Sequence, residues 1–151
     1  IALELMAEEA YGFTAAALLA PAAGDIKGLF GGEEGYAALK ATADKDGFVE
    51  FTTIYGQKQE LSREWFADLE KYEAVATDAA AKFAGKALVI YAKDDEAVAP
   101  DISKSVAEAL NAQVIEATGD GHSYGFYSDK TDILSAVANG AADFFAEALA
   151  K

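Results

Sequence analysis

Two short apolar runs separated by a helix-like segment constrain the fold of this chain more than any other feature. Leu88–Ala92 (LVIYA) and Gln113–Ala117 (QVIEA) are rich in residues that favour β-strands. Between them, Ile102, Val106 and Leu110 recur at helical spacing and predict an amphipathic helix. A strand, a helix and a second strand at this spacing predict a βαβ unit with parallel strands. The sequence therefore predicts an α/β fold with a parallel sheet flanked by helices.

Both ends of the chain extend this pattern. Residues 1–10 form an apolar-rich stretch that predicts the back part of a helix. Residues 13–21 (FTAAALLAP) predict a buried strand closed by Pro21. The segment after residue 131 predicts a closing helix. The candidate helix N-caps are, in chain order, Ser62, Asp101, and either Thr131 or Asp132.

Residues 24–77 interrupt the alternation of strands and helices. They contain turn signals at Gly31-Gly32 and Asp46-Gly47, a predicted strand over 48–56 and a predicted helix over 62–72. We expect a cap-like insertion in a single partial domain that covers residues 1–151. Its aromatic side chains could line an apolar substrate pocket or simply pack the insertion, and the sequence leaves both alternatives open. The candidate substrate-binding residues are Phe48, Phe51, Tyr55, Trp65 and Phe66.

The composition excludes several classes of function. With 26 acidic and 12 basic residues, the 151-residue chain has a formal net charge of −14, which disfavours binding to nucleic acid or to an anionic membrane. No apolar run approaches the roughly 20 residues of a membrane span. The lack of cysteine and the single histidine exclude thiolate and histidine-rich metal sites. We expect no metal, no cofactor, no nucleic-acid partner and no membrane partner; cysteine usage leaves the compartment open, and we expect the cytoplasm.

Gly121–Gly125 (GHSYG) satisfies the G-x-S-x-G pattern of a nucleophilic serine on a sharp strand-to-helix turn. The surroundings of Ser123 argue against that role. Gly119 and Asp120 separate the motif from the preceding strand, and no helix start follows before Thr131. The single histidine is the neighbour of this serine, whereas hydrolases with this turn run in the order serine, acid, histidine. We interpret the stretch as a histidine loop.

Loops with reactive side chains follow two of the predicted strands. Asp94 and Asp95 come directly after the first, and His122 follows the second. Because the carboxyl ends of parallel strands meet at one edge of the sheet, a carboxylate of one loop can accept the Nδ1–H of the imidazole on the other. Such a bond fixes the tautomer and stabilises the imidazolium formed during proton transfer. A lone histidine is also often a residue without chemistry, and this alternative stays open.

At these loops the chain resembles the C-terminal half of an α/β-hydrolase, in the branch of serine esterases that includes cinnamoyl (feruloyl) esterases. Leu18–Pro21 (LLAP) matches the segment after the strand that follows the nucleophile helix. Ala92–Val98 (AKDDEAV) matches a G-x-x-D-x-x-V acid loop with alanine in place of glycine, and Gly119–His122 (GDGH) matches a G-x-x-H loop. Residues 61–75 resemble the segment that leads out of that branch's cap. The resemblance covers essentially the whole chain.

The resemblance implies a site as well as a fold. It implies Asp95 as the acid of a catalytic triad, because the three-residue step to Val98 aligns Asp95 rather than Asp94. It implies His122 as the general base and a small-molecule ester as the substrate. The serine, the oxyanion hole and the first strands of the sheet are expected upstream of residue 1. The chain starts with Ile1 inside a helix, so we expect it to be a piece of a longer product.

Two classes of function follow. The first is a serine hydrolase that cleaves carboxylic esters through an acyl-enzyme, to which this chain supplies the acid and the histidine while being inactive by itself. The alternative is a non-catalytic α/β module that packs against a partner chain. In both, the strand over residues 15–19 would be an open apolar edge without lysine or proline inside it. We expect that edge to pair with the N-terminal half of the hydrolase or with a second copy.

Overall fold

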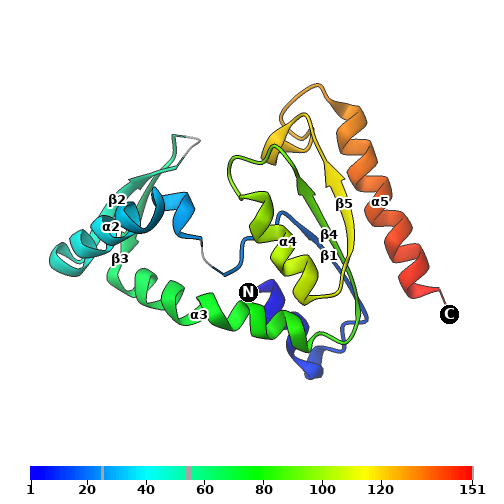
Figure 1. The fold of residues 1–151 in the computed structure, drawn as a ribbon, viewed down its shortest axis with the longest axis horizontal. Coiled ribbons are helices and arrows are strands. Elements are labelled where there is room, and N and C mark those ends of the chain that lie inside the picture. Colours follow the sequence, from blue (N-terminus) through cyan, green and yellow to red (C-terminus); the bar gives the residue numbers. More distant parts are fainter. Residues whose placement is uncertain (25, 54–55, 151) are drawn as a thin grey trace. The chain divides into compact units, whose positions relative to one another are not determined.

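The computed structural model describes residues 1–24, 26–53 and 56–150. The chain divides into two compact units, one made of Ile1–Ala23 with Ala76–Lys151 and the other of Gly24–Val75. Within the ranges just given, no helix is long and apolar enough to cross a membrane. The elements are α1 (Ala2–Ala7), η1 (Glu9–Tyr11), β1 (Ala15–Leu19), η2 (Lys27–Phe30), α2 (Gly32–Asp46), β2 (Phe48–Thr52), β3 (Lys58–Ser62), α3 (Arg63–Lys82), β4 (Lys86–Ala92), α4 (Pro100–Ala109), β5 (Gln113–Ala117), η3 (Gly121–Ser123) and α5 (Thr131–Leu149) (Figure 1).

A three-stranded parallel sheet in the order β1-β4-β5 forms the first unit. The central strand β4 pairs with β1, where Ala15 lies opposite Lys86, and with β5, where Leu88 lies opposite Gln113. The predicted parallel sheet is therefore confirmed. The predicted strand Gln113–Ala117 has the observed bounds, and β4 begins two residues before the predicted Leu88.

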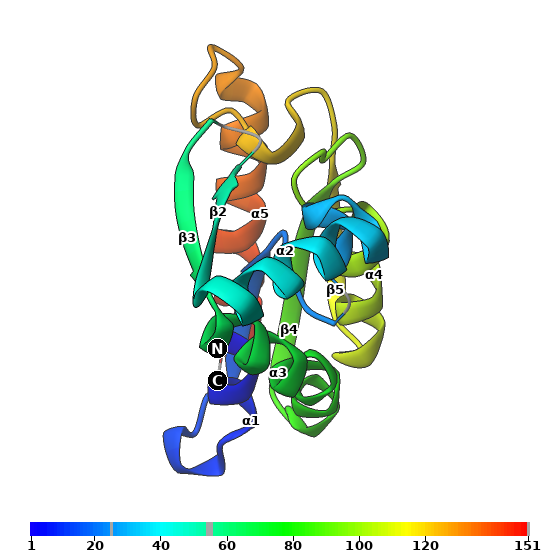
Figure 2. The same ribbon diagram turned by 90° about the vertical axis from the view of Figure 1, so that its left-hand side faces the viewer.

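Helices cover both faces of β4, which explains its unbroken apolar sequence. Side chains alternate along the strand, so Val89 and Tyr91 enter a core with α4, α1 and the end of α3, while Leu88 and Ile90 enter a second core with α5. Helices α4 and α5 lie on opposite sides of the sheet (Figure 1 and Figure 2). This layered arrangement fixes the carboxyl end of β4, where the loop with the candidate acid begins.

The predicted burial of the first strand is only partly right. Most side chains of β1 are half-buried, and Leu19 is 44% exposed. The reason is that β1 pairs with β4 on one side only among the described residues. Directly after it, Ala20 adopts a positive φ of 41° and its amide donates to the carbonyl oxygen of Ile90.

One of the predicted N-caps is confirmed and another is wrong. The Ser62 hydroxyl oxygen accepts a hydrogen bond from the Trp65 amide at 3.2 Å, at the start of α3. Asp101 is not the cap of α4 but lies in its first turn. Pro100 occupies the first helical position, where its missing N–H costs nothing, so Ala99 becomes the cap residue.

The start of α5 also differs from the prediction. Thr131 and Asp132 lie within its first turn, and the N-cap is Lys130, without a side-chain cap. The helix buries Val137 and Phe144 against the sheet. At Gly140 a Cβ would lie 2.4 Å from a methyl group of Ile115, so glycine allows α5 to approach β5 closely.

In the Gly24–Val75 unit, the strands β2 and β3 form an antiparallel hairpin, and α2 packs against β2. The sequence did not predict α2 or β3. Gly47, at a φ of 91°, ends α2 by donating its N–H to the Ala43 carbonyl oxygen, and the chain then enters β2. The buried core of this unit consists of Tyr36, Ala43, Leu61 and Phe66.

Candidate active site

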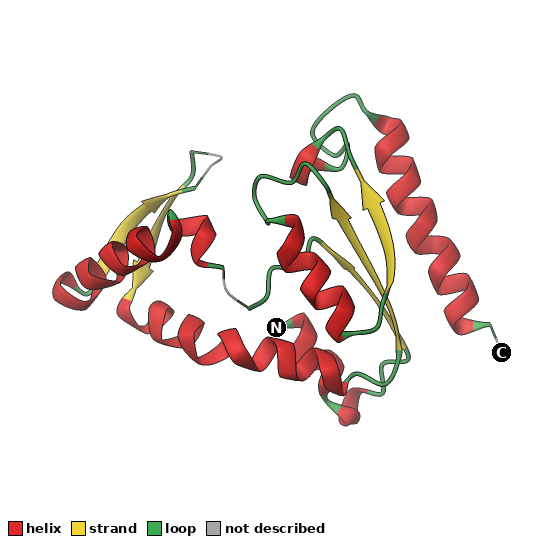
Figure 3. Cartoon of the chain, in the orientation of Figure 1, coloured by secondary structure: helices red, strands yellow, loops and turns green. Residues whose placement is uncertain are grey.

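The loops that follow β4 and β5 lie at the same end of the sheet (Figure 3). The amide of Lys93, just after β4, donates to the carbonyl oxygen of Ala117 at 2.9 Å, so the parallel pairing continues to the point where the two loops begin. Such an edge is where ligands bind in open α/β sheets. The fold therefore brings the acid loop and the histidine loop together, as the sequence predicted.

The Asp95 side chain is almost fully buried, with 1% of it exposed. Its Oδ1 accepts hydrogen bonds from the amides of Ala97 at 2.9 Å and Val98 at 2.8 Å. A side chain that bonds to the backbone two and three residues ahead closes a local turn. The turn anchors Oδ1 and leaves the second oxygen, Oδ2, facing the histidine loop.

The His122 imidazole is hydrogen-bonded to Asp95 Oδ2. The distance between His122 Nδ1 and Asp95 Oδ2 is 2.8 Å, and the imidazole side chain is 36% exposed. Because an ionised carboxylate can only accept, this bond places the proton of a neutral ring on Nδ1 and leaves Nε2 as the basic nitrogen. A buried acid behind a partly exposed imidazole is the arrangement of a general base with its orienting carboxylate.

Asp94 has a different set of partners. Its Oδ2 accepts hydrogen bonds from the amides of Gly119 at 2.8 Å and Gly121 at 3.3 Å. The Gly119 bond, more than the Gly121 bond, holds the pKa of the Asp94 carboxyl below its usual value of 3.8. Of the two adjacent acids, Asp95 contacts the imidazole and Asp94 ties the two loops together through the backbone.

Asp120 organises the interior of the histidine loop. Its Oδ2 accepts from the Gly125 amide at 2.7 Å and from the Ser128 hydroxyl at 3.0 Å. The Ser123 hydroxyl, followed by the Gly125 amide, lowers the pKa of the Asp120 carboxyl. Gly125 has a φ of 84°, and a Cβ there would lie 2.5 Å from the Lys130 carbonyl oxygen, so only glycine fits this turn.

Ser123 does not occupy a strand-to-helix turn. Gly121–Ser123 form a short 3₁₀ helix that begins four residues after the end of β5. The Ser123 Oγ accepts a long hydrogen bond of 3.4 Å from the Tyr127 amide, and α5 does not start until Thr131. This geometry agrees with the interpretation of the stretch as a histidine loop.

The candidate substrate-binding aromatics belong to the Gly24–Val75 unit, except that Tyr55 lies outside the described residues. Phe51 and Trp65 both contact Phe30, with ring centroids 5.1 and 5.4 Å away. Phe66 is fully buried behind Trp65, and Phe48 is 49% exposed on the opposite face of β2 from Phe51. The structure thus groups two of these residues around Phe30, which was not predicted to be a substrate-binding residue.

Asp120 and Tyr124 hold the histidine loop from within, and neither was predicted from the sequence as a site residue. The signal was available only in part, because the density of glycine between residues 119 and 125 indicates a strained loop without identifying its contacts. In the parts of the chain that the structure covers, no three histidine, cysteine or acidic side chains gather in a group that could hold a metal ion.

The chain superposes on several solved structures, which place it in a known fold. Est1E from Butyrivibrio proteoclasticus superposes with a TM-score of 0.67 at 19% identity, over 99% of this chain and 57% of that chain. Est1E with ferulic acid bound gives 0.63 at 20% identity, over 99% and 55%. A Mycobacterium tuberculosis H37Rv protein designated a non-heme bromoperoxidase, BpoC, gives 0.60 at 19% identity, over 99% and 63%. No protein-family model and no curated protein matches the chain.

These solved structures are α/β-hydrolases. The agreement over nearly the whole chain confirms the predicted fold: the chain has the α/β-hydrolase fold over the part that it spans. That part amounts to 55–63% of the length of the solved chains just named. A shared fold does not assign a reaction, so function has to be argued from the site.

Proposed function

We propose that this chain is the acid- and histidine-bearing part of a serine hydrolase that cleaves carboxylic esters. The observation that carries the proposal is the 2.8 Å bond between His122 Nδ1 and the buried Asp95, at the carboxyl edge of a parallel sheet. The nucleophilic serine and the oxyanion hole belong to a segment outside this chain. We call the protein in which that segment and this chain are joined the complete enzyme.

In the complete enzyme, Asp95 holds the His122 ring with its proton on Nδ1. His122 Nε2 takes the proton from the serine hydroxyl as the serine oxygen attacks the ester carbonyl carbon. The same nitrogen then gives this proton to the departing alcohol, which leaves an acyl-enzyme. Water, deprotonated by Nε2, attacks the acyl carbon and releases the carboxylic acid, after which the proton returns to the serine. No metal or cofactor is needed for these steps.

An aromatic acyl group is the substrate that we propose. Est1E, which is similar in fold, has been solved with ferulic acid, an aromatic acid. The aromatic residues that we propose to contact the substrate belong to the Gly24–Val75 unit, and two of them, the partly exposed Phe51 and Trp65, pack against Phe30. Flat apolar rings suit an aromatic acyl group better than a peptide. We propose that the unit acts as the cap of the hydrolase.

A fluorophosphonate probe, which modifies activated serines, tests the proposal. We expect the complete enzyme to be labelled at a serine outside these 151 residues and the isolated chain to stay unlabelled. Labelling of the isolated chain at Ser123 would contradict our interpretation of the histidine loop. A complete enzyme that resists the probe and hydrolyses no aryl ester would favour the non-catalytic module.

Among the described residues, β1 is paired on one side only. Next to its other edge lies an apolar hollow of about 220 Å³, to which Leu19, Phe126 and Leu134 contribute. Leu19 is 44% and Phe126 62% exposed. An apolar strand edge beside apolar side chains is a surface that water leaves readily when another strand pairs with it. We propose that a strand of the serine-bearing segment pairs with β1 and covers the hollow.

Sedimentation of the isolated chain checks this partnership. We expect the isolated 151-residue chain to self-associate or to unfold without cooperativity, because its β1 edge and the neighbouring hollow stay open. The complete enzyme should sediment as a defined species with a cooperative thermal transition. A monomeric isolated chain that unfolds cooperatively would show that the edge needs no partner.

A further inference from the structure

Tyr124 lies directly behind the pair of Asp95 and His122. Only 2% of it is exposed, and its ring meets the imidazole in an edge-on arrangement with centroids 6.2 Å apart. Its hydroxyl oxygen lies 3.1 Å from the amide nitrogen of Ala92 and 3.4 Å from Asp95 Oδ2. The hydroxyl is therefore placed between the end of β4 and the acid that follows it.

The direction of the phenolic proton follows from these two distances. The Ala92 amide can only donate, so the Tyr124 oxygen accepts its hydrogen bond. The one proton of the phenol is then free to point at Asp95 Oδ2, which can only accept when ionised. Burial, reinforced by the Asp95 charge, raises the pKa of Tyr124 to about 12, so the phenol keeps this proton at neutral pH.

The backbone around Tyr124 is adapted to this placement. Tyr124 has a φ of 50°, in the left-handed region that side chains other than glycine seldom adopt. The next residue, Gly125, also has a positive φ, and the bond from its amide to Asp120 fixes the turn. A strained tyrosine held by its loop fits a role in the site better than simple packing.

We propose that Tyr124 is a positioning residue of this site, and that its phenol fixes the orientation of the Asp95 carboxylate toward His122. The inference rests on the proposed function. Two backbone amides hold Asp95 Oδ1, while Oδ2 is shared between the imidazole and the phenol. At 3.4 Å the phenol bond is long, so Tyr124 contributes less than Asp95 itself. Its effect reaches the reaction through the tautomer and orientation of the His122 ring.

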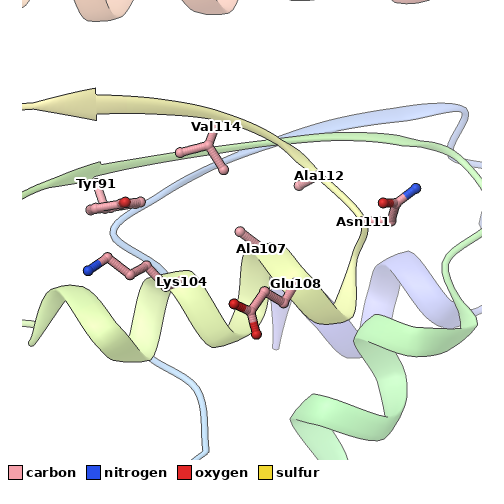
Figure 4. A pocket seen from close by; sticks show the side chains of 7 residues that line it. All are labelled: Tyr91, Lys104, Ala107, Glu108, Asn111, Ala112 and Val114. Carbon is pink, nitrogen blue, oxygen red and sulfur yellow. The ribbon is translucent and has the colours of Figure 1, made fainter.

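Tyr124→Phe in the complete enzyme tests this role, with Tyr91→Phe as the matched control. Tyr91 is also a buried tyrosine, on β4, but it lies on the α4 side of the sheet beside Lys104 (Figure 4) and donates to Glu116 at 2.9 Å. We expect Tyr124→Phe to lower kcat about threefold to tenfold with an unchanged KM, because the phenol does not touch the substrate. Tyr91→Phe should leave both constants unchanged.

Nitrogen-15 NMR of the imidazole gives a readout that packing alone would not move. The chain has a single histidine, so selective labelling of the complete enzyme and comparison with its His122→Ala variant identify the ring nitrogens of His122. In Tyr124→Phe we expect a larger share of the tautomer with the proton on Nε2, whereas Tyr91→Phe should match the wild type. The wild-type protein needs no substitution for a second check: the phenolic proton and the Nδ1 proton share one acceptor oxygen, so they should show a nuclear Overhauser effect.

The outcomes separate this inference from the proposed function. If Tyr124→Phe leaves kcat and the ring-nitrogen signals unchanged, or if the wild-type contact between the two protons is absent, the role of Tyr124 is wrong while the triad assignment stands. If His122→Ala retains full activity, the proposed function itself fails. If both tyrosine variants lower kcat equally, the loss comes from general destabilisation and the inference is overturned.

Discussion

Replacing His122 by alanine in the complete enzyme is expected to lower kcat/KM for an aryl ester by about 10⁴- to 10⁶-fold. Without the imidazole, no group takes the proton from the serine or returns it to the leaving alcohol. The loss should fall on kcat, since the ring is needed for proton transfer rather than for substrate binding. Steady-state kinetics with a chromogenic aryl ester measures both constants.

Ser123→Ala is the matched control, because this serine is the neighbour of His122. Among the described residues, its hydroxyl accepts a long hydrogen bond from the Tyr127 amide and contacts Asp120. We expect the substitution to change kcat/KM by less than about threefold. Circular dichroism and thermal unfolding of both variants show whether the fold is kept. Full activity in His122→Ala would contradict the assignment of His122 as the general base. Complete loss of activity in Ser123→Ala would instead indicate that Ser123 is the nucleophile.

The second large effect is expected for Asp95→Asn, which should lower kcat by about 10³- to 10⁴-fold without unfolding the protein. The amides of Ala97 and Val98 need an oxygen opposite them, so the new side chain places its NH₂ group toward His122. An NH₂ group donates to Nδ1 instead of accepting from it, and the neutral ring then carries its proton on Nε2. In that tautomer the imidazole cannot accept the proton of the serine.

Asp94→Asn removes the same charge one residue earlier and serves as the comparison. Its amide oxygen can still accept from the Gly119 and Gly121 amides, so we expect a loss of activity below about tenfold. Kinetics of the two variants, with thermal unfolding alongside, distinguishes the two acids. A larger loss in Asp94→Asn than in Asp95→Asn would reverse their roles.

The elements nearest the site could be predicted from the sequence because their buried positions are occupied by apolar residues in a recognisable pattern. Helices cover both faces of β4, so nearly all of its side chains are apolar, and such a continuous apolar run predicts a buried strand. By contrast, α2 buries little besides Tyr36 and Ala43, and β3 carries Leu61 as its one buried apolar residue. Their surfaces are mostly polar, and their structure comes from packing within a small unit, so periodicity gave no usable signal.

The same contrast holds within the site. Asp95 and His122 could be placed together because loops after neighbouring parallel strands share one edge of the sheet. The acid's other contacts could not be predicted, since they depend on the local path of the backbone. Tyr124 reaches Asp95 only through a positive φ, and Asp94 binds two amides of the glycine-containing loop. Such contacts arise from turn geometry, which single residues do not encode.

In the sequence, the Gly24–Val75 unit is inserted between β1 and β4, and this has a consequence for the order of folding. The hairpin of β2 and β3 pairs residues that are close in sequence. By contrast, Ala15 of β1 pairs with Lys86 of β4, and the whole Gly24–Val75 unit lies between them in the sequence. Closing a long flexible loop costs conformational entropy, and contacts distant in sequence form slowly. A unit that has already become compact shortens the flexible connection between the two strands. We therefore expect the inserted unit to gain structure first and the parallel sheet, with its acid and histidine loops, to be completed afterwards.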